Sequence, residues 1–144
     1  MKNYVIAFCI GMFFFTGVTN AQRLKEANVT QPVKAALAKK YPQATKVTWE
    51  KEKGNYEANW GGKSGEDNSV QFTPSGDFVE IVEAIPVNSL PKQVISYIKE
   101  HYKGARITEA GKVTDAKGKI SYEAEVNRKD IIFDEKGNFV KVED

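Results

Sequence analysis

Three glutamates on predicted strands are the side chains whose type and spacing best suit chemistry. Glu57 lies in the segment Tyr56–Trp60, and Glu123 and Glu125 lie in the segment Lys119–Val126. Two carboxyl groups about 5 to 10 Å apart can hydrolyse a glycosidic bond. Alternate residues of a strand point to one face of a sheet, so the same glutamates also fit a solvated sheet face. We favour the solvated face, because strand carboxylates there need no catalytic role.

The nucleophiles that most enzymes use are scarce in this chain. It has one cysteine, Cys9, and one histidine, His101. A nucleophile–base pair would have to combine His101 with a serine such as Ser96 or Ser121, and no G-x-S-x-G elbow accompanies them. These counts argue against thiol catalysis, disulfide scaffolds and most zinc sites. We expect His101 to sit near a helix C-terminus, where a cation is favoured, and we predict no enzyme activity.

Two loops resemble ligand-binding motifs only superficially. The Gly-Lys-Ser at 62–64 lacks the glycine that a phosphate-binding loop needs five residues earlier, where this chain has Glu57. The segment 134–138 contains a lysine and is too short for a calcium loop of the EF-hand type. Both segments are interpreted as turns. The sequence therefore predicts no metal and no cofactor.

The composition is that of a globular protein of modest size. The 144 residues are 41% hydrophobic and 28% charged, with 21 basic and 19 acidic side chains and a formal net charge of +2. This mixture argues against intrinsic disorder. The near balance of charges gives no reason to expect a nucleic-acid partner.

The first 21 residues have the features of a secretory signal peptide. Lys2 precedes an apolar run over residues 4–15, and small residues stand at Thr19 and Ala21. We predict cleavage between Ala21 and Gln22; the alternative is an uncleaved anchor, although a membrane span needs about 20 apolar residues. Cleavage leaves 123 residues without cysteine. We expect a bacterial periplasmic or secreted protein that is not stably inserted in a membrane.

An internal repeat organises the remaining chain. Residues 29–44 match residues 90–105, and residues 72–79 match residues 133–140, both at an offset of 61. Each unit of about 60 residues is marginal as an independent domain. We therefore predict a single domain over 22–144, built from two repeats at about 29–86 and 87–144.

Each repeat is predicted to hold one helix and four strands. Val33, Leu37 and Tyr41 recur at helical spacing, as do Val94 and Ile98 in the second unit. Thr30 is placed to cap the first helix. The strands follow the helices as closely spaced hairpins, which pair antiparallel. The predicted fold class is α+β, with one curved antiparallel sheet of about eight strands and two helices packed on one face.

The alternation of the strands divides their side chains between the two faces of this sheet. Trp49 and Trp60 share parity with apolar neighbours and are predicted to be buried. The face turned away from the helices can remain open to water. Its members Glu57, Asn59, Glu123 and Glu125 are our candidates for contact with a partner.

The chain resembles the PepSY-like, beta-lactamase-inhibitor-like family of small exported bacterial proteins. The resemblance is carried by Val47-Thr48-Trp49, the strand Gly54–Ala58, the turn Phe72–Gly76 and their counterparts at 122–126 and 132–138. It covers residues 29–143 and implies a tandem α+β unit. The family has no catalytic motif to transfer, so the resemblance implies no activity.

Our leading hypothesis is therefore a non-enzymatic binding module that holds a protein or peptide in the periplasm by its open sheet face and hairpin loops. One alternative, suggested by the resemblance, is an inhibitor of an exported hydrolase such as a peptidase or beta-lactamase, with loop 61–68 entering the active site. The other alternative is a carrier of a small ligand between helices and sheet.

Overall fold

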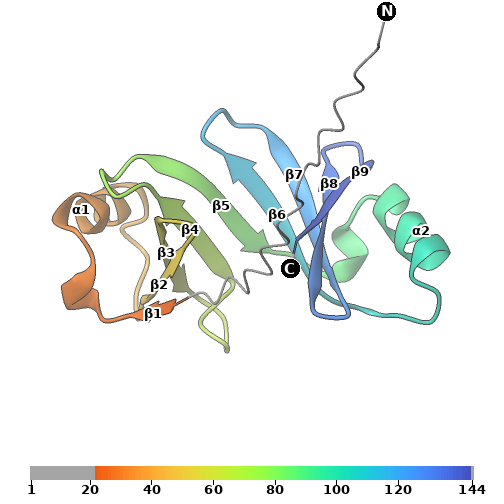
Figure 1. Ribbon diagram of the computed structural model, residues 1–144, viewed down its shortest axis with the longest axis horizontal. Coiled ribbons are helices and arrows are strands. Elements are labelled where there is room, and N and C mark those ends of the chain that lie inside the picture. The colour runs from red at the N-terminus through yellow and green to blue at the C-terminus, as the bar shows by residue number, and fades with distance from the viewer. Residues whose placement is uncertain (1–21, 144) are drawn as a thin grey trace, which may run out of the picture.

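A computed structural model of the chain describes residues 22–143, so the predicted signal peptide and Ala21 lie outside the described residues. Its nine strands form one antiparallel sheet in which each strand lies beside its neighbours in the sequence. Two helices accompany the sheet, α1 (Gln31–Lys40) and α2 (Lys92–His101). The predicted α+β class and the single antiparallel sheet are confirmed (Figure 1).

The strands fall into two groups, each preceded by a helix. After α1 come β2 (Thr48–Glu52), β3 (Asn55–Trp60), β4 (Asn68–Phe72) and β5 (Phe78–Ala84), and after α2 come β6 (Ile107–Asp115), β7 (Ile120–Val126), β8 (Lys129–Asp134) and β9 (Phe139–Glu143). The 3-10 helices Glu26–Asn28 and Val87–Ser89 lead into α1 and α2. The two groups are joined where β5 pairs with β6, with Val82 opposite Val113.

The expected number of about eight strands was wrong by one. A ninth strand, β1 (Gln22–Leu24), pairs with β2 and places Leu24 opposite Trp49. It has three residues, too few for alternation to reveal it in the sequence.

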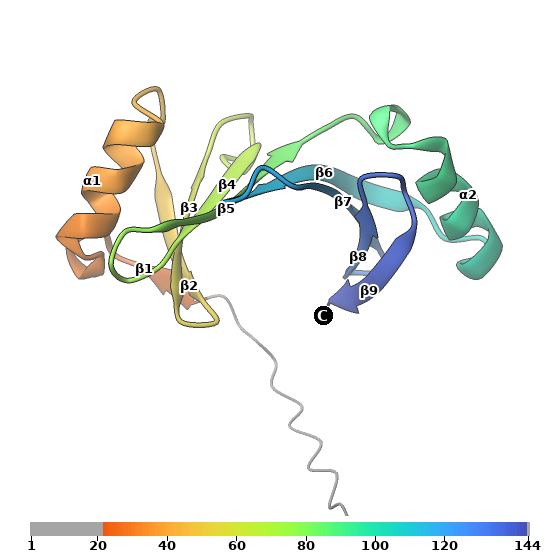
Figure 2. The ribbon, with the colours of Figure 1, turned by 90° about the horizontal axis from the view of Figure 1, so that it is seen from above.

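The sheet is strongly curved, and both helices lie on its outer, convex side (Figure 2). Each helix covers its own apolar cluster. Val33 and Leu37 of α1 pack with Trp49, Trp60 and Phe72, and Val94 and Ile98 of α2 pack with Ile131 and Phe133. The burial of Trp49 and Trp60, 4% and 5% exposed, confirms the prediction from alternation.

Tight turns set the register of the hairpins. Lys53 and Gly54 connect β2 to β3, and Asn127 and Arg128 connect β7 to β8, with positive φ at all four residues. Two-residue turns of this kind match the right-handed twist of the strands. Between β8 and β9, Asp134 accepts backbone N–H bonds from Lys136 and Asn138, so its carboxylate serves the turn.

The turn before β5 docks on the start of α1. The Thr30 hydroxyl donates a hydrogen bond to the carbonyl of Pro74 (3.1 Å) rather than capping the helix, so the predicted cap was wrong. Gly76 has φ +89°, and a Cβ on it would lie 2.7 Å from the Pro32 carbonyl oxygen. Glycine is needed here both for its backbone conformation and for the close approach.

Gly76→Ala is expected to destabilise the protein more than Gly54→Ala. Both glycines have φ +89°, but a Cβ on Gly54 meets nothing within 4 Å. Gly54→Ala should therefore cost only about 1–2 kcal/mol of backbone strain, whereas Gly76→Ala adds about 1–3 kcal/mol of overpacking. Urea unfolding of both variants measures the difference, and equal costs would show that the docking of the turn on α1 is unimportant.

Candidate functional site

The concave side of the sheet is hollowed by two adjoining clefts that no helix covers. Their volumes are about 420 Å³ and about 460 Å³. Both are lined by Ser69, Val82, Glu123 and Asp130, so they form one continuous depression, which we call the acidic trough. Loop 61–67 between β3 and β4 contributes Ser64 to its rim.

Acidic side chains are concentrated in the trough. Among residues 22–143, ten acidic residues line it, against two basic residues. The acidic residues are Glu52, Glu57, Glu66, Asp67, Glu80, Glu109, Glu123, Glu125, Asp130 and Glu143, and the basic ones are Lys53 and Lys141. A chain with a net charge near zero thus presents one strongly negative surface.

The antiparallel register explains how these residues meet. Glu80 lies opposite Gln71, and Glu125 lies opposite Asp130. Glu123 lies opposite Gly111 on β6, where a Cβ would be only 2.7 Å from a methyl of Val82. The absence of a side chain at Gly111 therefore lets Val82 and the Glu123 side chain pack over β6.

The floor of the trough is apolar. Val113 and Ile132 are 5% and 9% exposed, although neither belongs to the clusters under the helices. Val82, Val113 and Ile132 line the second cleft together. The trough therefore offers apolar contact at its base and charge on its walls.

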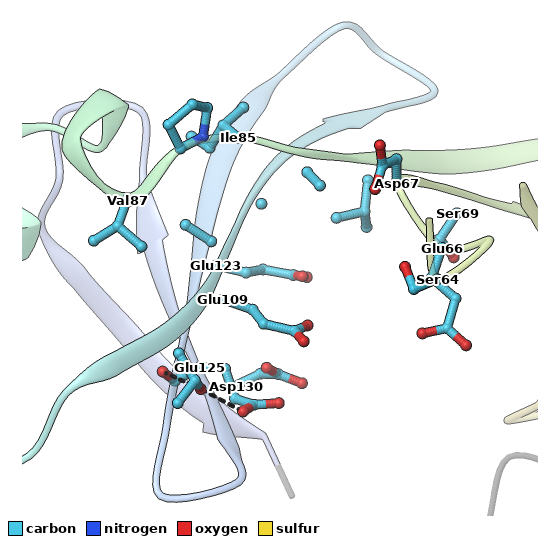
Figure 3. A pocket seen from close by; sticks show the side chains of 16 residues that line it. Ser64, Glu66, Asp67, Ser69, Ile85, Val87, Glu109, Glu123, Glu125 and Asp130 are labelled. Carbon is cyan, nitrogen blue, oxygen red and sulfur yellow. Dashed lines mark hydrogen bonds between the residues drawn. The ribbon is translucent and has the colours of Figure 1, made fainter. Parts of the chain in front are cut away.

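Several carboxyl groups crowd one another in the first cleft. Glu109, Glu123, Glu125 and Asp130 project from one wall towards the space bounded by Glu66 and Ser64 (Figure 3). Burial raises the pKa of Glu123 to about 8, and the charge of Asp130 adds to this effect. Burial, followed by the charge of Glu125, also raises the pKa of Asp130.

The second cleft shows the same crowding. Burial is the main cause that raises the pKa of Glu57, although a hydrogen bond from the Ser69 hydroxyl (2.6 Å) opposes it. Burial and the charge of Glu143 raise the pKa of Glu80. The trough therefore contains many more carboxyl groups than cationic side chains, and its negative charge is not balanced.

The two ends of the curved sheet approach each other across the mouth of the trough. Lys53, in the turn after β2, lies 3.8 Å from Glu143 of β9 between Nζ and Oε1. Lys141 also donates to the same carboxylate oxygen. The two lysines of the trough thus act at one end of it, beside Glu143.

The structure places the four predicted partner-contact residues on this face with unequal access. Glu57, Glu123 and Glu125 line the trough. Asn59 points to the same side of β3 but is 6% exposed and lines neither cleft. Gln22, on the carboxyl side of the predicted cleavage point, begins β1.

Other residues of the trough were missed by the sequence analysis. Glu80 could have been found, because alternation puts it on the face opposite the buried Ile81. Asp130 and Glu143 reach the trough through the pairing of β8 with β7 and β9. Lys53 carries no local signal, because the curvature of the sheet brings it to Glu143. His101 lies elsewhere, stacked on Tyr97 at 4.0 Å between ring centroids.

The residues described show no arrangement typical of a metal centre or a membrane span. Between residues 22 and 143, no three side chains among His, Cys, Asp and Glu are grouped so as to hold a metal ion. In the same part of the chain, neither helix is long and apolar enough to cross a membrane.

Comparison with known families identifies the family to which the chain belongs. A family model described as "Putative beta-lactamase-inhibitor-like, PepSY-like" matches residues 61–141, more than half of the sequence. The chain belongs to this PepSY-like family. No curated protein matches the sequence.

Solved structures share the PepSY-like fold. A periplasmic protein from Bacteroides eggerthii is 21% identical with a TM-score of 0.67, covering 80% of this chain and 88% of its own. A DUF2874 family protein from Bacteroides uniformis is 23% identical with a TM-score of 0.66 (78% and 87% covered). A BLIP-like protein from Bacteroides fragilis is 22% identical with a TM-score of 0.60 (80% and 85% covered). At these identities the likeness concerns the fold alone.

The raised pKa of Glu123 predicts a stability that falls as pH rises. The ordinary pKa of a glutamate is 4.5 and that of Glu123 is about 8, so between these values the folded protein holds a proton that the unfolded chain has released. Its contribution is complete below pH 4.5 and is lost towards pH 8, at up to about 1.4 kcal/mol per pH unit. Glu123→Gln should remove this slope and raise the unfolding free energy at pH 8.

Urea unfolding at several pH values between 4.5 and 8.5 measures the effect. Glu109→Gln, at an exposed position on β6 in the same cleft, is the matched control and should retain the slope. A Glu123→Gln variant that keeps the slope of the unaltered protein would show that Glu123 is not the group responsible.

Proposed function

We propose that this PepSY-like protein is an exported, non-enzymatic binding module that holds a cationic segment of a protein or peptide in the acidic trough. The observation that carries the proposal is the charge segregation, ten acidic against two basic side chains on one uncovered concave surface. Lysine and arginine side chains supply the positive charge that the crowded carboxyl groups lack. Their alkyl stems fit the apolar floor.

The distribution of the raised pKa values favours binding over catalysis. Carboxyl groups with raised pKa values lie on four strands, at Glu57, Glu80, Glu123 and Asp130. A glycoside hydrolase needs one pair with its two pKa values pushed apart. Here the raised pKa values are spread along the trough, and the pKa of Glu143 is lowered chiefly by its hydrogen bond from Lys141. This is the pattern expected for a surface that binds several cationic side chains.

Export of the protein is part of the proposal. Structures of the same fold are described as periplasmic proteins. All nine described strands lie on the carboxyl side of the proposed cleavage point. The two halves, which share the order helix then four strands, are proposed to be copies of one unit.

The inhibitor alternative draws support only from descriptions of relatives. The family description contains the term "beta-lactamase-inhibitor-like". The protein from Bacteroides fragilis is described by the abbreviation "BLIP-like". The likeness to that structure, at 22% identity, extends to the fold and not to its binding. The trough therefore remains the better-supported basis for function.

Reversing charge inside the trough should weaken the binding of a basic peptide. Glu125→Lys combined with Asp130→Lys changes two opposed side chains on β7 and β8. We expect at least a tenfold rise in Kd for a fluorescent lysine-rich peptide, which is about 1.4 kcal/mol or more. Fluorescence anisotropy at two salt concentrations measures binding, which should weaken as salt increases.

A matched control separates the trough from net charge. Glu100→Lys with Glu135→Lys makes the same change in net charge at exposed positions on α2 and in the β8–β9 turn, and should leave Kd nearly unchanged. A glutamine-rich peptide of equal length should bind weakly. The proposal fails if both double variants bind the lysine-rich peptide equally, or if neither peptide binds the unaltered protein.

The export proposal predicts the mass of the mature protein. When the full chain is expressed in a bacterium with a periplasm, the soluble protein should begin at Gln22. Intact mass spectrometry of the periplasmic fraction measures this, with a cytoplasmic preparation for comparison. Retention of residues 1–21 by a membrane-bound product would support the uncleaved anchor instead.

A further inference from the structure

Strand β9 is an open edge of the sheet with an unusual surface. The strand order leaves it with β8 as its only neighbour. Within residues 22–143 the exposed large hydrophobic side chains are Phe139, Val140 and Val142, 42%, 54% and 40% exposed, and all three lie on this strand. Exposed apolar side chains on an unpaired edge mark a place where another strand can add.

Strand β5 is the counterpart of β9 in the first half of the chain, and it is paired with a neighbouring strand on both edges. The sequence Phe-Val-Glu-Ile of 78–81 aligns with Phe-Val-Lys-Val of 139–142 at the repeat offset of 61. Both strands have a register irregularity at the same place, opposite Phe72 and opposite Phe133. Yet Ile81 is 8% exposed and its counterpart Val142 is 40% exposed.

The difference between the two strands lies in their neighbours. Strand β5 is paired with β6 on its far edge, from Glu80 to Ala84, and β9 has no strand there. Val142 therefore has the exposure of a residue whose second neighbouring strand is missing.

We propose that β9 is a dimerisation edge that pairs antiparallel with β9 of a second copy of this chain. A two-fold axis at Val142 places Val142 opposite its own counterpart. It also places Lys141 of each copy opposite Glu143 of the other. Opposite charges directly across antiparallel strands are stabilising, so the edge is complementary to itself in both apolar contact and charge.

The register is compatible with the geometry of β9. The irregularity lies at Phe139–Lys141, so the regular part of the strand begins at Lys141, and the proposed pairing is centred one residue further on. Pairing of β9 with the other edge, β1, is less suitable because a head-to-tail contact would continue as an open filament. A two-fold β9 contact closes at two copies.

The proposed charge pairing can be tested with several variants, so the test does not depend on the folding of any single variant. Lys141→Glu places a glutamate opposite Glu143 in both cross-strand pairs, and Glu143→Lys places a lysine opposite Lys141 in both. Each variant alone should therefore weaken dimerisation at least tenfold. The double exchange Lys141→Glu with Glu143→Lys restores opposite charges and should restore the dimer. A mixture of the two single variants should form a heterodimer.

Sedimentation equilibrium of protein expressed from the full chain, over a range of concentrations, measures these associations. Val142→Lys should also give a monomer, whereas Ala35→Lys, at an exposed position on α1, should leave the dimer intact. A monomeric unaltered protein at every concentration overturns the proposal. Single charge variants that dimerise as well as the unaltered protein overturn the register and with it the proposed edge.

Discussion

The antiparallel pairing of β5 with β6 is the contact on which the rest of the architecture depends. Each half of the chain has one helix and a few strands, which is a marginal amount of core for independent folding. Pairing Val82 with Val113 joins the halves into one nine-stranded sheet. Both helices then lie on the convex side, and the concave side is left without a covering layer (Figure 2).

The curvature of the sheet and its acidic side chains together make the concave side a negatively charged depression. Side chains that would stand apart on a flat sheet converge in the trough, and most of them are carboxylates. The pKa of Glu123 rises to about 8 because burial and the neighbouring acids disfavour its charge. Among the described residues, only Lys53 and Lys141 oppose this crowding from within the trough, and both act near Glu143. A cationic partner would supply what the fold itself lacks.

Local rules predicted the parts of this structure that depend on local geometry. Alternation along β3 correctly separated Trp60 from Glu57. The helical spacing of apolar residues located both helices, and turn signals located the hairpins that follow them. The three residues of β1 escaped because a strand this short has no periodicity.

The convergence of distant residues could not be predicted in the same way. The approach of Lys53 to Glu143 joins the β2–β3 turn to the last described strand, and it depends on how strongly nine strands curve. The hydroxyl of Thr30 had a plausible local role as a cap that accepts a backbone N–H bond, but it makes no such bond and donates to the carbonyl of Pro74 in the docked turn. The alternation of residue types in the sequence therefore identifies which face of the sheet is polar. The shape of that face follows from long-range packing.

The most direct test of the central claim is a carboxyl-carbon NMR titration of Glu123 with and without a lysine-rich peptide. We expect an apparent pKa near 8 in the free protein. We also expect a clear fall in that pKa when the peptide is bound, because a cation in the trough favours the ionised carboxyl group. An ordinary pKa in the free protein, or a raised pKa that the bound peptide leaves unchanged, would contradict the claim that the trough is a crowded anionic site for a cationic partner.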